Sequence, residues 1–147
     1  MTGPMTASAQ YATFLLDGLL FGVDVLQVQE VIRYQPMTRV PRAPAVVEGL
    51  INLRGQIVTA IDLRKRLGFA PRQPDQLPMN VVVSNSDGVV SLLVDAIGDV
   101  VDVEPDQFEA VPETVSPRVR DVVAGVFKLR DGLMLVLDPA KAVNADD

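Results

Sequence analysis

The chain has 147 residues, 48% of them hydrophobic, and a formal net charge of −6 at pH 7. It contains neither cysteine nor histidine, which excludes disulfides, thiolate or imidazole metal ligands and histidine general bases. The acidic net charge disfavours nucleic acid as a partner, because phosphate binding requires a basic surface.

The charges are unevenly distributed along the chain. Residues 1–72 carry eight Lys/Arg and five Asp/Glu, whereas residues 73–147 carry five against fourteen. No stretch is long and apolar enough to predict a membrane-spanning helix or a signal peptide. We therefore expect a cytoplasmic protein with a mildly basic first half and a strongly acidic second half.

The first predicted elements are two strands, over 11–16 and 19–25, joined by the favourable turn pair Asp17 and Gly18. The apolar period then becomes helical, which predicts a short helix over 26–33 that lies on the sheet. The prolines that follow, Pro36, Pro41 and Pro44, predict a loop.

A second hairpin is predicted over 47–61, with its turn at Gly55 and Gln56. Asp62 is placed to cap a short helix that ends at Gly68. The basic residues inside this helix are expected to be exposed. The polar, proline-rich stretch 71–78 then predicts a linker or loop.

The second half repeats this order of elements. Strands are predicted over 80–84, 89–95, 100–103, 125–129 and 133–137, followed by a short helix from Pro139. Residues 49–62 align without a gap on residues 125–138, with Gly, Leu, Arg and Asp at matching places. The repeat predicts two related β-subdomains. Closure into small barrels would hide the edges of their sheets.

The acidic residues of the second half raise the question of a catalytic or metal site. Asp95, Asp99 and Asp102 fit a solvated acidic face better than a metal site, because no glycine-anchored loop orders them. A carboxylate-dependent enzyme that uses Asp62 or Asp95 remains an alternative. A nucleic-acid-binding barrel is a weaker one, since the chain has two tyrosines, five phenylalanines and an acidic charge.

Arg54 is the residue that stands out, because it lies beside Gly55 at a predicted hairpin tip. The run from Glu48 to Arg64 resembles the signature of the CheW family; its sequence is EGLINLRGQIVTAIDLR. The runs FGVDVLQVQEV, from Phe21, and VDAIGDV, from Val94, support the resemblance in family order.

The resemblance implies a mainly β fold of two small five-stranded antiparallel β-barrels with a few short helices. It implies a single domain over 10–143 between tails at 1–9 and 144–147. The first barrel would span approximately 18–79, and the second 10–17 plus 80–143. CheW-like proteins are non-catalytic scaffolds, so we expect no enzyme activity, no cofactor and no metal.

The resemblance also implies partners. CheW-like proteins link the cytoplasmic tip of chemoreceptors (methyl-accepting chemotaxis proteins) to the regulatory domain of the histidine kinase CheA, and so associate with membrane-bound arrays without inserting into the membrane. The family's receptor-contacting arginine falls on Arg54. The positions that match other partner-binding residues of the family, Asn52, Gly49 and Glu30 for the receptor and Val28 and Val31 for the kinase, complete the predicted site.

Overall fold

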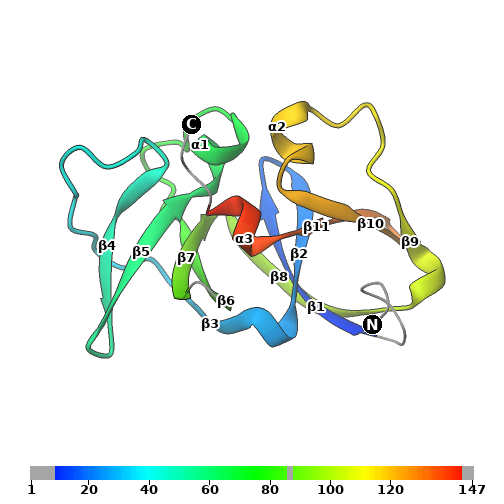
Figure 1. Cartoon of the computed structure of the whole chain (residues 1–147), viewed down its shortest axis with the longest axis horizontal. Helices are drawn as coiled ribbons and strands as arrows, with labels where there is room; N and C mark the ends of the chain where they lie inside the picture. Colours follow the sequence, from blue (N-terminus) through cyan, green and yellow to red (C-terminus); the bar gives the residue numbers. More distant parts are fainter. Residues whose placement is uncertain (1–8, 86–87, 144–147) are drawn as a thin grey trace.

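Two β-sheets, each flanked by short helices, make up the part of the chain that a computed structural model describes, residues 9–85 and 88–143 (Figure 1). The six-stranded sheet has the order β8-β1-β2-β11-β10-β9. Its strands are β1 (Ala9–Leu16), β2 (Leu19–Asp24), β8 (Ala96–Val103), β9 (Phe108–Glu109), β10 (Val123–Leu129) and β11 (Gly132–Leu137). The five-stranded sheet has the order β3-β6-β7-β5-β4. Its strands are β3 (Val28–Ile32), β4 (Val47–Leu53), β5 (Gln56–Asp62), β6 (Met79–Asn85) and β7 (Gly88–Val94).

The mainly β class with a few short helices is confirmed. One sheet has a strand more than predicted, because β9 pairs with β10. Most neighbours are antiparallel, but β11 runs parallel to β2 and β5 runs parallel to β7. Among the described residues, each sheet has two edge strands that are not paired with each other. Closure of the sheets into barrels therefore stays a prediction.

The division of strands between the sheets differs from the expected boundary near residue 79. Strand β2 belongs to the six-stranded sheet because it forms a tight hairpin with β1. Strands β6 and β7 belong to the other sheet, where they pair with β3 and β5. The chain therefore crosses between the sheets twice, from β2 to β3 and from β7 to β8, whereas the expected boundaries lay near residues 17 and 79.

The predicted helix over 26–33 is wrong. Val25–Gln27 form one 3-10 turn, η1, and Val28–Ile32 form the edge strand β3, antiparallel to β6. Val28 and Ile32 suit one face of a helix, but they also suit a strand with a bulge. Backbone hydrogen bonds to β6, which lies some 50 residues away in the sequence, decide in favour of the strand.

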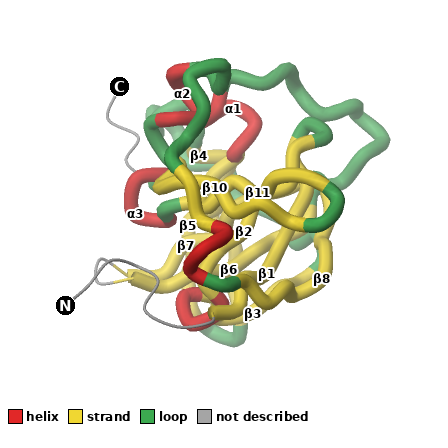
Figure 2. The backbone as a smooth tube through the Cα atoms, turned by 90° about the vertical axis from the view of Figure 1, so that its right-hand side faces the viewer, coloured by secondary structure: helices red, strands yellow, loops and turns green. Residues whose placement is uncertain are grey.

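The predicted short helices after the two aspartates are confirmed as α1 (Leu63–Leu67) and α3 (Pro139–Ala142). Asp62 caps α1, and Gly68 ends it in the left-handed conformation, as expected. A further helix, α2 (Pro117–Arg120), was not predicted. Arg118 of α2 donates to the carbonyl oxygens of Lys65 and Arg66 at 2.9 and 3.1 Å, which holds α2 against α1 (Figure 2).

The largest hydrophobic cluster is shared by the two sheets. It includes Phe14 and Phe21, whose stacked rings lie 5.6 Å apart, from one sheet, and Ile61 and Leu92 from the other. A smaller cluster lies within each sheet, around Phe127 and around Ile51. Within the described ranges, every helix is too short or too polar to cross a bilayer.

The internal repeat is visible in the backbone. Hairpin β4–β5 has a register shift between Val47 and Gly49, and hairpin β10–β11 has one between Val123 and Gly125. Each hairpin leads into a short helix, and each has a parallel neighbour in its sheet. The two hairpins of the predicted repeat thus share these backbone features.

Candidate partner-binding surface

Arg54 lies at the tip of hairpin β4–β5. This hairpin reaches the lower left of Figure 1. Leu53 pairs with Gln56, so the two turn residues are Arg54 and Gly55, one position earlier than predicted. Both have positive φ, 54° and 89°, which is the geometry of a type I′ turn. The side chain of Arg54 is 82% exposed, so the tip presents a guanidinium to a partner.

Asn52 and Glu30 hold this tip from two sides. The Oδ1 atom of Asn52 accepts a hydrogen bond of 2.9 Å from the backbone N–H of Gly55. Arg54 Nη1 lies 3.2 Å from Oε1 of Glu30, which sits on edge strand β3. The structure therefore brings together three of the predicted residues, and it joins the hairpin tip to the opposite edge of the sheet.

Gly49 does not belong to this exposed group. It is buried in β4, where an isolated bridge joins Leu50 to Thr38 through hydrogen bonds of 2.9 and 2.8 Å. A Cβ atom at position 49 would lie 2.8 Å from the carbonyl oxygen of Thr38 and 3.0 Å from Cβ of Met37. Gly49 thus permits the close approach of two backbone segments. Because it is buried, it can affect a partner only indirectly, through the conformation of β4.

The two residues predicted to bind the kinase differ in accessibility. Val31 is 38% exposed on edge strand β3. Val28 is half-buried and packs against the hydrophobic cluster shared by the sheets. Of the two, Val31 offers a partner more of its side chain.

One residue of this surface escaped the sequence analysis. Ile57 pairs with Asn52 across the hairpin and is 62% exposed. A large apolar side chain directly after a predicted turn was the available signal, but alternation alone placed it in the strand. Arg54, Glu30 and Ile57 together form what we call the first tip surface.

The other sheet carries a related arrangement. Arg130 and Leu133 occupy the repeat positions of Arg54 and Ile57. Edge strand β8 occupies the place of β3, since Val100 pairs with Ala12 of β1 as Val31 pairs with Val81 of β6. Asp99 therefore stands where Glu30 stands. The sequence repeat was the signal from which this second tip surface could have been predicted.

The second tip surface is open where the first is bridged. Among the described residues, no ion pair joins Arg130 to Asp99, and both line a groove of about 770 Å³. Leu15, Leu19 and Leu133 form much of its wall, and each is at least 40% exposed.

Asp95 lies in a partly buried ion cluster rather than on the solvated acidic face that was expected. Its carboxylate accepts hydrogen bonds from Nη2 of Arg64 at 2.7 Å, Nε of Arg72 at 3.0 Å and the backbone N–H of Asp17 at 2.8 Å. Arg64 and Arg72 are only 12% and 10% exposed, so the expectation that Arg64 is exposed was wrong as well.

The charges of this cluster are stabilised by their neighbours. Burial raises the pKa of Asp95, but hydrogen bonds from Arg64, Asp17 and Arg72 outweigh it and hold the pKa below its usual value. The hydrogen bond with Asp95 raises the pKa of Arg64, against the effect of burial. Asp95 is thus ionised at neutral pH and is not available as a general acid.

The other acidic candidates have structural partners too. Asp62 accepts a hydrogen bond of 3.0 Å from the backbone N–H of Arg64 and so caps α1. Asp102 accepts one of 3.0 Å from the side chain of Gln10 at the sheet edge. In the described part of the chain, no three acidic side chains gather in a way that could hold a metal ion.

Comparison with known proteins agrees with the geometry. Residues 10–147 match the CheW-like domain family. The chain is 34% identical over 117 residues to "Chemotaxis protein CheW" of Rhizobium meliloti, covering 80% of this chain and 75% of that protein. It is 28% identical over 142 residues to the protein of the same name from Klebsiella aerogenes, covering 97% and 86%. The crystal structure of "scaffolding protein TtCheW" from Thermoanaerobacter tengcongensis superposes with a TM-score of 0.78 at 30% identity, covering 88% of each chain.

Proposed function

Because this chain belongs to the CheW family, we propose that it couples chemoreceptors to the histidine kinase CheA in a bacterial chemosensory array. Family membership makes it a chemotaxis scaffold protein. Its place would be the cytoplasmic side of the membrane, where it would associate with receptors through their cytoplasmic tips. The proposed action is binding alone, with no catalysis.

The observation that carries this proposal is the exposed Arg54, held by Glu30 and an Asn52-braced turn. A type I′ turn restricts the backbone, and the ion pair limits the guanidinium, so little freedom remains to be lost on binding. Arginine can donate two parallel hydrogen bonds to a carboxylate, and the neighbouring Ile57 adds apolar area. Such a surface suits the side of a receptor helix that carries both carboxylate and apolar side chains.

A capture experiment tests the receptor site. A receptor cytoplasmic fragment and the CheA regulatory domain are each immobilised, and wild type is compared with Arg54→Glu. We expect receptor capture to fall at least tenfold in the variant, while CheA capture persists. The free energy of unfolding should change by less than about 0.5 kcal/mol, because an exposed ion pair contributes little to stability.

The repeat provides a matched control for that experiment. Arg130→Glu makes the same charge change at the equivalent tip, and receptor capture should be retained. An equal loss in both variants would show that net charge, not the first tip surface, governs capture. Failure of the folded wild-type protein to bind either partner would overturn the coupling function.

The kinase site is proposed to include Val31, with Val28 supporting it from the interior. Val31→Asp should weaken CheA capture and lower the free energy of unfolding by only about 1 kcal/mol, since the side chain is 38% exposed on an edge strand. Receptor capture by the same variant distinguishes a kinase site from a general disturbance of β3. Loss of both partners to the same extent would contradict the assignment.

A further inference from the structure

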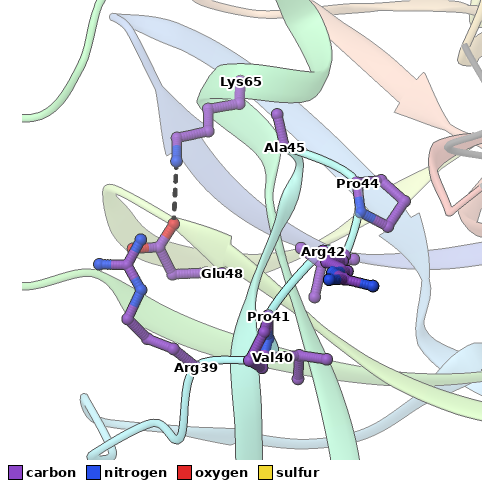
Figure 3. Close-up of a pocket in the computed structure, with 10 residues that line it drawn as sticks. Arg39, Val40, Pro41, Arg42, Pro44, Ala45, Glu48 and Lys65 are labelled. Carbon is purple, nitrogen blue, oxygen red and sulfur yellow. Dashed lines mark hydrogen bonds and ion pairs between the residues drawn. The ribbon is translucent and has the colours of Figure 1, made fainter.

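The loop between β3 and β4 encloses a hollow of about 560 Å³ at the end of the sheet away from Arg54 (Figure 3). Arg39 and Arg42 come from the loop, Glu48 from β4 and Lys65 from α1. Glu48 in the lining of the hollow and Arg54 at the hairpin tip are six positions apart along β4, a distance of about 20 Å at roughly 3.3 Å per residue. The two surfaces are therefore distinct.

The hollow has an excess of positive charge. Nζ of Lys65 lies 3.3 Å from Oε1 of Glu48, so these two charges offset each other. Within residues 9–85 and 88–143, neither Arg39 nor Arg42 has an acidic partner. Two exposed guanidinium groups thus line the hollow without a counter-charge.

The loop holds these groups in a restricted backbone. Pro41 and Arg42 are the central residues of a turn closed by a hydrogen bond of 3.3 Å from the N–H of Ala43 to the carbonyl of Val40. Arg42 has a φ of 68°, a conformation that glycine favours at this position of a turn. Pro44 restricts the following segment, and its carbonyl accepts a hydrogen bond of 2.9 Å from the N–H of Val47.

The chemistry of the lining favours carboxylates on a peptide. The planar fork of arginine matches a carboxylate, and Val40 and Pro41 offer apolar area to a peptide backbone. A nucleic acid or an anionic membrane usually requires a larger basic cluster than the two unpaired arginines of this hollow. We propose that the hollow formed by Arg39, Arg42 and Lys65 is a docking site for an acidic segment of a partner protein.

Binding of a hexaglutamate peptide, with hexaglutamine as the uncharged control, tests this site by titration calorimetry at low salt. Wild type should bind hexaglutamate, and the double variant Arg39→Gln/Arg42→Gly should bind it at least tenfold more weakly. Glycine at position 42 suits the positive φ, so this variant is expected to fold. Arg120→Gln removes an exposed arginine of α2 outside the hollow, and it should bind as wild type does.

Several results would overturn the proposal. These are no binding by wild type, equal binding of hexaglutamine, equal losses in the double and Arg120→Gln variants, or competition by millimolar inorganic phosphate. Removal of residues 144–147, which include Asp146 and Asp147, tests whether this chain supplies its own acidic segment. A tenfold gain in affinity would assign the hollow to that segment instead of a partner. Receptor and CheA capture do not enter this assay, so its failure leaves the coupling function untouched.

Discussion

Hairpins β4–β5 and β10–β11 share a backbone plan, yet different side chains complete it. Each has a bulge beside a glycine and leads into a helix capped by aspartate, Asp62 in one and Asp138 in the other. Two residues after the first cap, Arg64 reaches Asp95; two residues after the second stands Ala140. The features that shape the backbone recur in both units, whereas the ion cluster occurs in one.

The hairpin tips show the same contrast. Arg54 is bridged to Glu30 across the sheet, while Arg130 and Asp99 line an open apolar groove. A duplicated scaffold thus presents two chemically different tip surfaces at related places.

Among the changes that test this comparison, removal of the Asp95 carboxylate should lower the free energy of unfolding most. Asp95→Asn leaves Arg64 and Arg72, both nearly buried, without their nearest anion, and only the more distant Asp17 (3.5 Å from Arg64) and Asp62 (3.9 Å from Arg72) remain. We expect a loss of about 2–4 kcal/mol in the free energy of unfolding. Urea denaturation measures it. Asp102→Asn, at an exposed site of the other sheet, should cost less than about 0.5 kcal/mol. Similar losses in both variants would mean that the ion cluster contributes no more to stability than an exposed aspartate does.

Substitution of the bulge glycines should have an intermediate effect on the free energy of unfolding. It tests whether Gly49 and Gly125 have the same role in the two hairpins. Gly49→Ala places a methyl group against the Thr38 carbonyl, and Gly125→Ala places one against the ring of Phe108. Each should lower the free energy of unfolding by about 1–3 kcal/mol, because the neighbouring segment must move. A neutral result at either position would show that the glycines have different roles in the two units.

Acidification should have the smallest effect on stability. It removes only the part of the Asp95 contribution that depends on the charge of the carboxylate. The pKa of Asp95 lies below its usual value of 3.8 in the folded protein. Its stabilising contribution is therefore complete at neutral pH and is lost as the pH falls below about 4, through the folded pKa. The stability gap between wild type and Asp95→Asn should narrow in that range. A gap that stays constant from pH 7 to pH 3 would contradict an ionic origin.

Short-range signals predicted much of the molecule. Asp17 and Gly18 predicted the first turn, Asp62 and Gly68 the limits of α1, and the repeat of residues 49–62 the second hairpin unit. The family resemblance also rested on one contiguous run. In each case the residues that determine the structure are neighbours in the chain, because capping and turn geometry act over a few bonds.

Only the tertiary structure decided how remote segments meet. Residues 28–32 form a strand because β6 supplies hydrogen-bonding partners, although their local pattern also fits a helix. Arg54 meets Glu30, and Arg64 meets Asp95, across 24 and 31 residues of sequence. No local pattern specifies such pairs, because they depend on which sheet edges fold toward each other. The sequence alone determined the family and the hairpin units, and the tertiary structure decided which of the described charges lie close enough to neutralise each other.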